Sequence, residues 1–302
     1  MNTYIYYSRP GQVLSYPYFI LLFSYSIIHQ LRYNKCMKNI KLLVFDIDGT
    51  LIPRGSEVLE ESTKLAINEC MAKGIKVMIS TGRCSYLIQK DALKSIHSDY
   101  VVTINGALIC DSNLNTLYIN KMSEEVFNQI LKEAIDLDIA LAYKFEKHIV
   151  VYNKYQDYIN TYVNGKEMPC ILNYENKRDY HLNYGMPCGA FVIGDNDKLK
   201  TLASRVPSMT WVVAYDHGME CFNKCISKAS GIKLVLDQLN LTFDNVMAFG
   251  DSQNDIEMLT DAAIGVAMGN ATEETKKAAD YITTASGDNG IYNALKHFNL
   301  IS

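Results

Sequence analysis

Short apolar runs alternate with amphipathic stretches along most of this chain. The run Leu42–Phe45 is apolar without a break, which is typical of a strand buried on both faces of a parallel sheet. Strand patterns also cover 75–79, 100–104, 246–249, 264–267 and 281–283, and helical patterns cover 59–73, 86–96, 232–239 and a stretch that begins near residue 290. Because strands and helices alternate, we predict an α/β fold with a parallel sheet and helices on both faces.

Between residues 121 and 220 the strand and helix patterns no longer alternate one for one. Ser123 is expected to cap a helix, and the segments 140–145 and 148–152 read as two strands around a tight turn. The same helix-strand-strand order returns over 198–204, 210–214 and 219–222. Strands joined by hairpins imply an antiparallel sheet, so we predict an inserted α+β domain over 121–220 within a core formed by 37–120 and 221–302.

The first 36 residues follow neither pattern. They are rich in tyrosine, and the apolar run 13–28 is interrupted by Pro17 and falls short of the about 20 apolar residues that a membrane-spanning helix needs. A basic start and a small-residue cleavage site are missing, which argues against a signal peptide. We expect residues 1–36 to be an extension without a fold of its own, with Met37 as the natural start; an anchor lying on a membrane surface is the alternative.

Composition narrows the class of protein. A chain of 302 residues favours two domains, and 48% hydrophobic residues are typical of a folded protein. The formal net charge of -4 and the absence of a Lys/Arg block argue against a nucleic-acid surface. The eight cysteines show no C-x-x-C spacing, so we expect reduced thiols in the cytoplasm.

Four polar clusters fall at or near the ends of predicted core strands. They are Asp46 with Asp48, then Thr81-Gly82-Arg83, then Lys228, and then Asp251 with Asn254 and Asp255. Each has a structural alternative: a turn, a solvated helix start or a helix N-cap. Taken together they favour a site, because four carboxylates at one edge of a sheet would repel one another unless a cation neutralised them. Their hard oxygen atoms suit Mg²⁺.

The order of these motifs resembles that of the haloacid dehalogenase-like (HAD) phosphatases. The resemblance lies in D-I-D-G-T-L, S-T-G-R, a lone lysine opening a helix and G-D-S-Q-N-D-I-E-M-L. The later N-G-A and A-M-G-N-A, and the large insert, are similar to the Cof-type subfamily. Over residues 37–302 this resemblance implies a Rossmann-like core with the inserted domain as a cap.

The resemblance also implies roles for individual residues. Asp46 would be the nucleophile that forms an aspartyl-phosphate, and Asp48 the general acid and base. Mg²⁺ would be held by Asp46, the Asp48 carbonyl and Asp251, with Asp255 in support. The phosphate-binding groups would be Ile47, Thr81, Gly82, Lys228 and Asn254. Arg83 and Asn105 are candidates for substrate binding or support.

These inferences predict a cytoplasmic, Mg²⁺-dependent phosphatase whose partner is a small phosphorylated metabolite, either a sugar phosphate or a cofactor phosphate. We expect no nucleic-acid or membrane partner, and the oligomeric state is not predicted. One alternative is a phosphomutase of the phosphomannomutase type, which would need phosphate-gripping residues in the cap. The candidates are Lys144, Lys147, Lys177, Arg178 and His181. The other alternative is a non-catalytic phosphometabolite-binding protein.

Overall fold

The structure is a computed structural model that describes residues 39–88, 95–215 and 217–302. The prediction for residues 1–36 and most of the helix predicted over 86–96 lie outside these ranges. At the start of that segment the structure has a short 3-10 helix, Ser85–Leu87.

The first of two sheets has eight strands in the order β14-β13-β12-β1-β2-β3-β4-β5. The strands are β1 (Leu42–Phe45), β2 (Lys76–Ser80), β3 (Tyr100–Thr103), β4 (Leu108–Asp111), β5 (Thr116–Ile119), β12 (Val246–Gly250), β13 (Ile264–Ala267) and β14 (Tyr281–Ile282). The strands from β14 to β3 are parallel, which confirms the predicted sheet, and β1 lies at its centre between β12 and β2. The antiparallel hairpin of β4 and β5 was not predicted.

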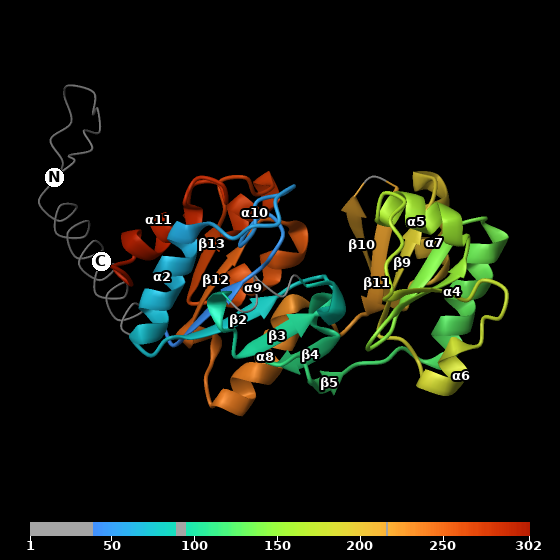
Figure 1. The fold of residues 1–302 in the computed structure, drawn as a ribbon, viewed down its shortest axis with the longest axis horizontal. Coiled ribbons are helices and arrows are strands. Elements are labelled where there is room, and N and C mark those ends of the chain that lie inside the picture. Colours follow the sequence, from blue (N-terminus) through green and yellow to red (C-terminus); the bar gives the residue numbers. More distant parts are fainter. Residues whose placement is uncertain (1–38, 89–94, 216) are drawn as a thin grey trace, which may run out of the picture. The chain divides into compact units, whose positions relative to one another are not determined.

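Helices cover both faces of this sheet. They are α2 (Glu61–Ala72), α8 (Lys228–Leu239), α9 (Ile256–Asp261), α10 (Glu273–Ala278) and α11 (Gly290–His297). Leu42 and Val44 pack with residues of α8 and α9. The alternate residues Leu43 and Phe45 are equally buried and point to the other face, where α2 and α11 pack together (Figure 1). Burial on both faces explains the unbroken apolar run in β1.

The second sheet has six strands in the order β10-β11-β9-β6-β7-β8. They are β6 (Ala140–Lys144), β7 (Ile149–Asn153), β8 (Ile171–Asn173), β9 (Gly189–Ile193), β10 (Met209–Tyr215) and β11 (Gly218–Asn223). The predicted hairpins β6–β7 and β10–β11 are antiparallel, and so are the pairs that β9 forms with β6 and β11. The strands β8 and β9 were not predicted, and β8 pairs with β7 in parallel. The strands β6 to β10 of this sheet fall within residues 121–220, where the sequence pattern changes. The domain limits at 121 and 220 stay a prediction.

Four helices accompany the second sheet: α4 (Glu124–Asp136), α5 (Tyr155–Tyr162), α6 (Tyr180–Tyr184) and α7 (Asn196–Arg205). The predicted cap of α4 is confirmed, because the Ser123 side chain accepts a hydrogen bond from the Val126 amide. Residues of α4 and α7 form one apolar cluster with alternate residues of the sheet, among them Tyr143 and Cys221. Helix α5 packs beside Phe191, a strand residue outside that cluster. One sheet face is therefore filled by α4 and α7, and the other is covered by α5 only in part.

Across the residues with described positions, no helix is both long and apolar enough to cross a membrane.

Candidate active site

The loop that follows β1 sets two carboxylates against different partners. Gly49 adopts a φ of +89°, which other residues rarely reach, and its amide donates a hydrogen bond to the Ile52 carbonyl at 2.8 Å. A Cβ atom at this position would lie 2.3 Å from the Asp251 Oδ2 atom. Glycine therefore permits both the turn and the close approach of Asp251. On this turn Asp46 is buried, whereas the Asp48 side chain is half-exposed.

Lys228 forms ion pairs with Asp46, which follows β1, and with Asp255, in the loop after β12. It is the first residue of α8, whose N-cap Ser227 accepts a hydrogen bond from the Ser230 amide. Its ammonium lies 2.6 Å from the Asp46 Oδ1 atom and 2.6 Å from the Asp255 Oδ1 atom. Only 1% of the Lys228 side chain is exposed, so the alternative of a solvated helix start is wrong.

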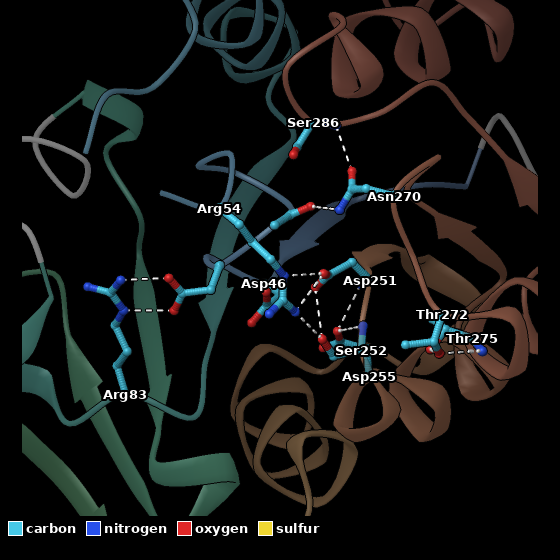
Figure 2. A network of polar contacts seen from close by, with 12 residues as sticks. Asp46, Arg54, Arg83, Asp251, Ser252, Asp255, Asn270, Thr272, Thr275 and Ser286 are labelled. Carbon is cyan, nitrogen blue, oxygen red and sulfur yellow. Dashed lines mark hydrogen bonds and ion pairs between the residues drawn. The ribbon is translucent and has the colours of Figure 1, made fainter. Parts of the chain in front are cut away.

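The loop after β12 orients the other two carboxylates. The second oxygen of Asp255 accepts hydrogen bonds from the backbone amides of Asp251, at 3.0 Å, and Ser252, at 2.9 Å. Asp255 therefore does more than act as the N-cap of α9, because it also connects the loop after β12 to Lys228. Figure 2 shows the side chains of Asp46, Asp251 and Asp255 converging.

These three carboxylates crowd one buried place. One carboxylate oxygen from each residue lies within 4.8 Å of the corresponding oxygens of the other two. Burial raises the pKa of Asp46 to about 8; Lys228 opposes this rise, and Asp255 and Asp251 add to it. Burial raises the pKa of Asp251 as well, against the hydrogen bond from Arg54. Three carboxylates thus face one buried ammonium and the Arg54 guanidinium, and an all-oxygen donor set of this kind fits a Mg²⁺ ion.

Arg54 is a site residue that the sequence analysis missed. Its Nη2 atom lies 2.9 Å from the Asp251 Oδ2 atom and donates a hydrogen bond to the Ser252 hydroxyl at 2.8 Å (Figure 2). The carboxylate of Asp251 raises the pKa of Arg54. The only sequence signal was its place four residues after the motif threonine, Thr50, and a lone arginine in a loop is usually solvated.

Arg83 holds the second carboxylate of the motif. Its Nη2 and Nε atoms bind the two oxygens of Asp48 at 2.6 and 2.7 Å, which makes the pair bidentate. The Arg83 amide donates to the Thr81 hydroxyl at 3.1 Å. Thr81 and Gly82 both line the same cavity as Asp46 and Asp48. The structure therefore brings the second motif up to the first.

A chain of side chains connects the second sheet to the loop after β12. Lys144 forms an ion pair with Glu220 and donates to the Gly82 carbonyl at 3.3 Å. Glu220 accepts from the Asn105 side chain at 2.6 Å, and Asn105 accepts from Asn254 at 2.8 Å. Glu220 was not predicted, since nothing near it in the sequence marks a site.

Three of the five predicted basic residues of the cap, Lys144, Arg178 and His181, have local partners. Arg178 donates to the Tyr152 carbonyl at 3.0 Å, and the His181 ring packs on Phe127. Lys144 is paired with Glu220, as described above. None of the five candidates is among the residues that line the cavity at Asp46. This arrangement favours hydrolysis over a mutase that grips a second phosphate.

A cavity of about 880 Å³ opens over Asp46 and Asp48. Its core side is lined by Asp46, Asp48, Arg54, Gly55, Thr81, Gly82, Arg83, Leu87, Ser252, Gln253, Asn254 and Thr272. The second sheet, the last residue of α5 and the segment between α5 and β8 supply the remaining lining residues. Lys228, Asp251 and Asp255 lie behind Asp46 and are almost fully buried. Cys84 is buried too, and burial raises the pKa of its thiol to about 11.

A sequence model of the haloacid dehalogenase-like hydrolases matches residues 43–295 of this chain. The chain belongs to this family. The Cof-type motifs of this chain therefore lie on a HAD core. The enzyme is a HAD-type phosphatase.

Named relatives agree with this assignment. The 5-amino-6-(5-phospho-D-ribitylamino)uracil phosphatase YcsE of Bacillus subtilis is 32% identical over 275 residues, which cover 87% of this chain and 97% of that protein. A Streptococcus pyogenes relative, named for phosphatase and peptidyl-prolyl cis-trans isomerase activities, is 30% identical over 87% of this chain, which spans only 55% of its length. A solved sugar phosphatase of HAD subclass IIB has a TM-score of 0.76 and 26% identity, covering 86% of this chain and all of its own.

Proposed function

We propose that this phosphatase hydrolyses phosphate monoesters of small metabolites, sugar phosphates or cofactor phosphates, through an aspartyl-phosphate on Asp46. One observation carries the proposal: the Asp46 carboxylate borders the cavity while its Oδ1 atom is held 2.6 Å from the buried Lys228 ammonium. The names of the ribitylaminouracil phosphatase and of the sugar phosphatase support this class of substrate. The metabolite meets the enzyme in the cytoplasm, and residues 121–220 act as the cap over the site.

The reaction takes two displacements at phosphorus. An oxygen of Asp46 attacks the phosphorus, the bond to the ester oxygen breaks, and Asp48 gives that oxygen a proton. Water then attacks the phosphorus of the aspartyl-phosphate, Asp48 takes a proton from it, and the bond to Asp46 breaks. Inorganic phosphate leaves, and both carboxylates return to their starting state.

The carboxylates of Asp46 and Asp251 and the carbonyl of Asp48 would hold Mg²⁺, with Asp255 orienting the loop. A bound Mg²⁺ ion offsets the charge of the carboxylates and of the phosphoryl oxygens. Lys228 supplies a fixed positive charge beside Asp46, so that the nucleophile and the phosphate can approach each other. The groups that would bind phosphoryl oxygens are the amides of Ile47 and Gly82, the Thr81 hydroxyl and the Asn254 side chain.

Arg83 determines when the Asp48 side chain is free to act on the substrate. The guanidinium holds both oxygens of Asp48, at 2.7 and 2.6 Å, and so fixes the position of this side chain. To give its proton to the ester oxygen, Asp48 must move away from this pair. An incoming phosphate, with its own negative charge, competes for Arg83 and so frees Asp48. Arg83 is for this reason proposed as a substrate-contacting residue, with Asn105 in support through Asn254.

Asp48→Asn is expected to slow hydrolysis of an alkyl phosphate by about 10²–10⁴-fold, because asparagine cannot donate or accept the proton. Acetyl phosphate has a leaving group that needs no proton, so its rate of first cleavage should fall much less. Stopped-flow release of acetate and steady-state release of phosphate measure the two cases. Equal losses with both compounds would contradict the role of Asp48 as an acid.

Metal removal is expected to abolish phosphate release and to lower stability. Mg²⁺ at one hundred times its Kd should raise the free energy of unfolding by about 2.7 kcal/mol, measured by urea titration of the protein with and without chelator. In Asp251→Asn, which lacks one buried ligand, this stabilisation should largely vanish. The exposed Asp261→Asn is the matched control and should respond as the parent does. A parent protein that Mg²⁺ neither stabilises nor activates would overturn the metal proposal.

The experiment that tests the function is an assay of phosphate release from a panel of phosphorylated metabolites with Mg²⁺. Release from at least one monoester, lost in Asp46→Asn, is the expected result. Transfer of phosphate from one position to another of a sugar monophosphate, without net release, would instead favour the mutase alternative. Tight binding of monoesters without turnover would favour the non-catalytic alternative.

A further inference from the structure

A buried ion pair on the second sheet contacts Asn105, which lies just after β3. Lys144, the last residue of β6, pairs with Glu220 on β11, and their side chains are only 2% and 14% exposed. Burial lowers the pKa of Lys144, but neighbouring groups, Glu220 foremost, outweigh burial and raise it, so the ammonium stays charged. The second oxygen of Glu220 accepts a hydrogen bond from the Asn105 side chain at 2.6 Å. Both carboxylate oxygens therefore have partners.

The ion pair sets the direction of a chain of hydrogen bonds. A carboxylate that faces an ammonium accepts hydrogen bonds and has no proton to donate, so Asn105 must turn its Nδ2 atom toward Glu220. The Asn105 Oδ1 atom then points the other way, where it accepts a hydrogen bond from the Asn254 Nδ2 atom at 2.8 Å. Each bond of this chain is thus donated in the direction from Asn254 through Asn105 to Glu220.

Asn105 has little freedom to turn over. It is 1% exposed, and its backbone amide donates to the Thr81 carbonyl at 3.1 Å. A Cβ atom at Gly82 would lie 3.2 Å from the Asn105 Oδ1 atom and 3.5 Å from the Glu220 Oε2 atom, so the loop after β2 packs closely against the chain. Lys144 donates to the Gly82 carbonyl at 3.3 Å and so holds the same loop from the second sheet.

The direction of the chain matters at Asn254, which lines the cavity over Asp46 and Asp48. Its amide nitrogen carries two N–H groups, and giving one to Asn105 leaves the other for a further acceptor. If the chain ran the other way, the Asn254 oxygen would take the place of this nitrogen and turn a lone pair toward the same acceptor. A phosphoryl oxygen is attracted by the N–H group and repelled by the lone pair.

We propose that Glu220 is a positioning residue whose carboxylate sets the direction of the Asn105 and Asn254 hydrogen bonds, so that Asn254 presents an N–H group to the phosphate. This inference rests on the proposed function of the site, in which Asn254 binds a phosphoryl oxygen. Lys144 holds Glu220 in place from the other side. A residue of the second sheet thereby serves the phosphate itself, even in a donor whose leaving group is too small to reach that sheet.

The first test replaces the carboxylate by an amide of the same shape. In Glu220→Gln the Lys144 ammonium, which can only donate, takes the new oxygen, and the new NH₂ group faces Asn105 and reverses the chain. We expect the Kd of inorganic phosphate, measured by isothermal titration calorimetry on the full chain with Mg²⁺, to rise at least about tenfold. Charge alone predicts the opposite, because the substitution removes a negative charge near a bound anion. Unchanged or tighter binding would overturn the inference.

A second substitution should reverse this loss. In Lys144→Met combined with Glu220→Gln, methionine donates no hydrogen bond, so the glutamine oxygen is free to face Asn105 and restore the original direction. The Kd of inorganic phosphate should return to within about twofold of the parent value. Binding as weak as in Glu220→Gln alone would mean that the carboxylate acts in another way, and the inference would be wrong.

Asn105→Ala tests whether Glu220 acts through Asn105. It should raise the Kd about tenfold by itself, and adding Glu220→Gln should then change the Kd by less than about twofold, because the connection is already lost. A further large rise would contradict the inference. Thermal melting reports whether each variant is folded. If Glu220→Gln is not, Asn105→Ala must still bind weakly and the double variant with Lys144→Met must bind as the parent does.

The matched control is Glu133→Gln, which removes a carboxylate that pairs with Arg205 at 2.7 Å, between α4 and α7 and outside the cavity lining. It should leave the Kd of inorganic phosphate unchanged.

Turnover separates this inference from the proposed function. If the parent neither binds inorganic phosphate nor hydrolyses acetyl phosphate, the proposed function fails and the inference fails with it. If the parent does both, Glu220→Gln should lower kcat/KM for acetyl phosphate and for p-nitrophenyl phosphate by the same factor, because the two donors share the phosphate and differ in the leaving group. A loss confined to p-nitrophenyl phosphate would assign Glu220 to the leaving group and overturn the inference, while the function would stand.

Discussion

Asp46→Asn is expected to reduce phosphate release to below about a thousandth of the parent rate, because the amide cannot attack phosphorus. The fold should survive, since asparagine has nearly the same shape and removes one of three crowded buried carboxylates. Its oxygen can still accept the hydrogen bond from Lys228. Phosphate release with Mg²⁺ and a urea unfolding curve together measure both expectations.

Asp261→Asn, an exposed exchange of the same type, is the control for the amide itself. It should leave the rate and the unfolding midpoint unchanged. Turnover by Asp46→Asn at even a tenth of the parent rate would contradict the assignment of the nucleophile. Loss of its fold would show instead that the Asp46 charge is needed to balance Lys228, and trapping of labelled phosphate on the parent protein would then decide the assignment.

The central strands could be predicted because physical rules act on them locally. Leu42–Phe45 and Val246–Gly250 are apolar on both faces, and such runs lie in the middle of a parallel sheet. The β4–β5 hairpin lacked this signal: three residues of β5 are exposed, so no apolar alternation marks it. The elements β8 and α6 have three and five residues, which is too short for a period to be read.

The site likewise has residues that the sequence identifies and residues that only the structure identifies. Asp46, Asp48, Lys228 and Asp251 stand in short motifs that a sequence displays directly. The pairs that complete the site do not, because Arg54 and Asp251 are 197 residues apart and Asn105 and Glu220 are 115 apart. Nothing in the local sequence distinguishes such an arginine or glutamate from a solvated one. Only the sheet order and the second sheet's contacts bring these partners together.

Lys228→Met is expected to lower both activity and stability. Methionine keeps the length of the side chain but leaves the Asp46 and Asp255 carboxylates buried without their shared cation. Removing one partner from a buried ion pair typically costs about 3–5 kcal/mol of unfolding free energy. Urea unfolding in chelator, where no metal can replace the lost charge, measures this loss. Lys233→Met on the same helix removes an exposed lysine and should cost less than about 1 kcal/mol.

A double variant separates charge from packing as the cause of that loss. Asp255→Asn keeps an oxygen that can accept the Asp251 and Ser252 amides while it removes one of the stranded charges. If uncompensated charge is the cause, Lys228→Met combined with Asp255→Asn should be more stable than Lys228→Met alone, with a coupling of about 0.5–3 kcal/mol. Additive losses would mean that Lys228 stabilises the fold by packing, and its proposed electrostatic role beside Asp46 would lose its main support. Activity should stay low in the double variant either way, because the phosphoryl group still lacks the positive charge that Lys228 provides.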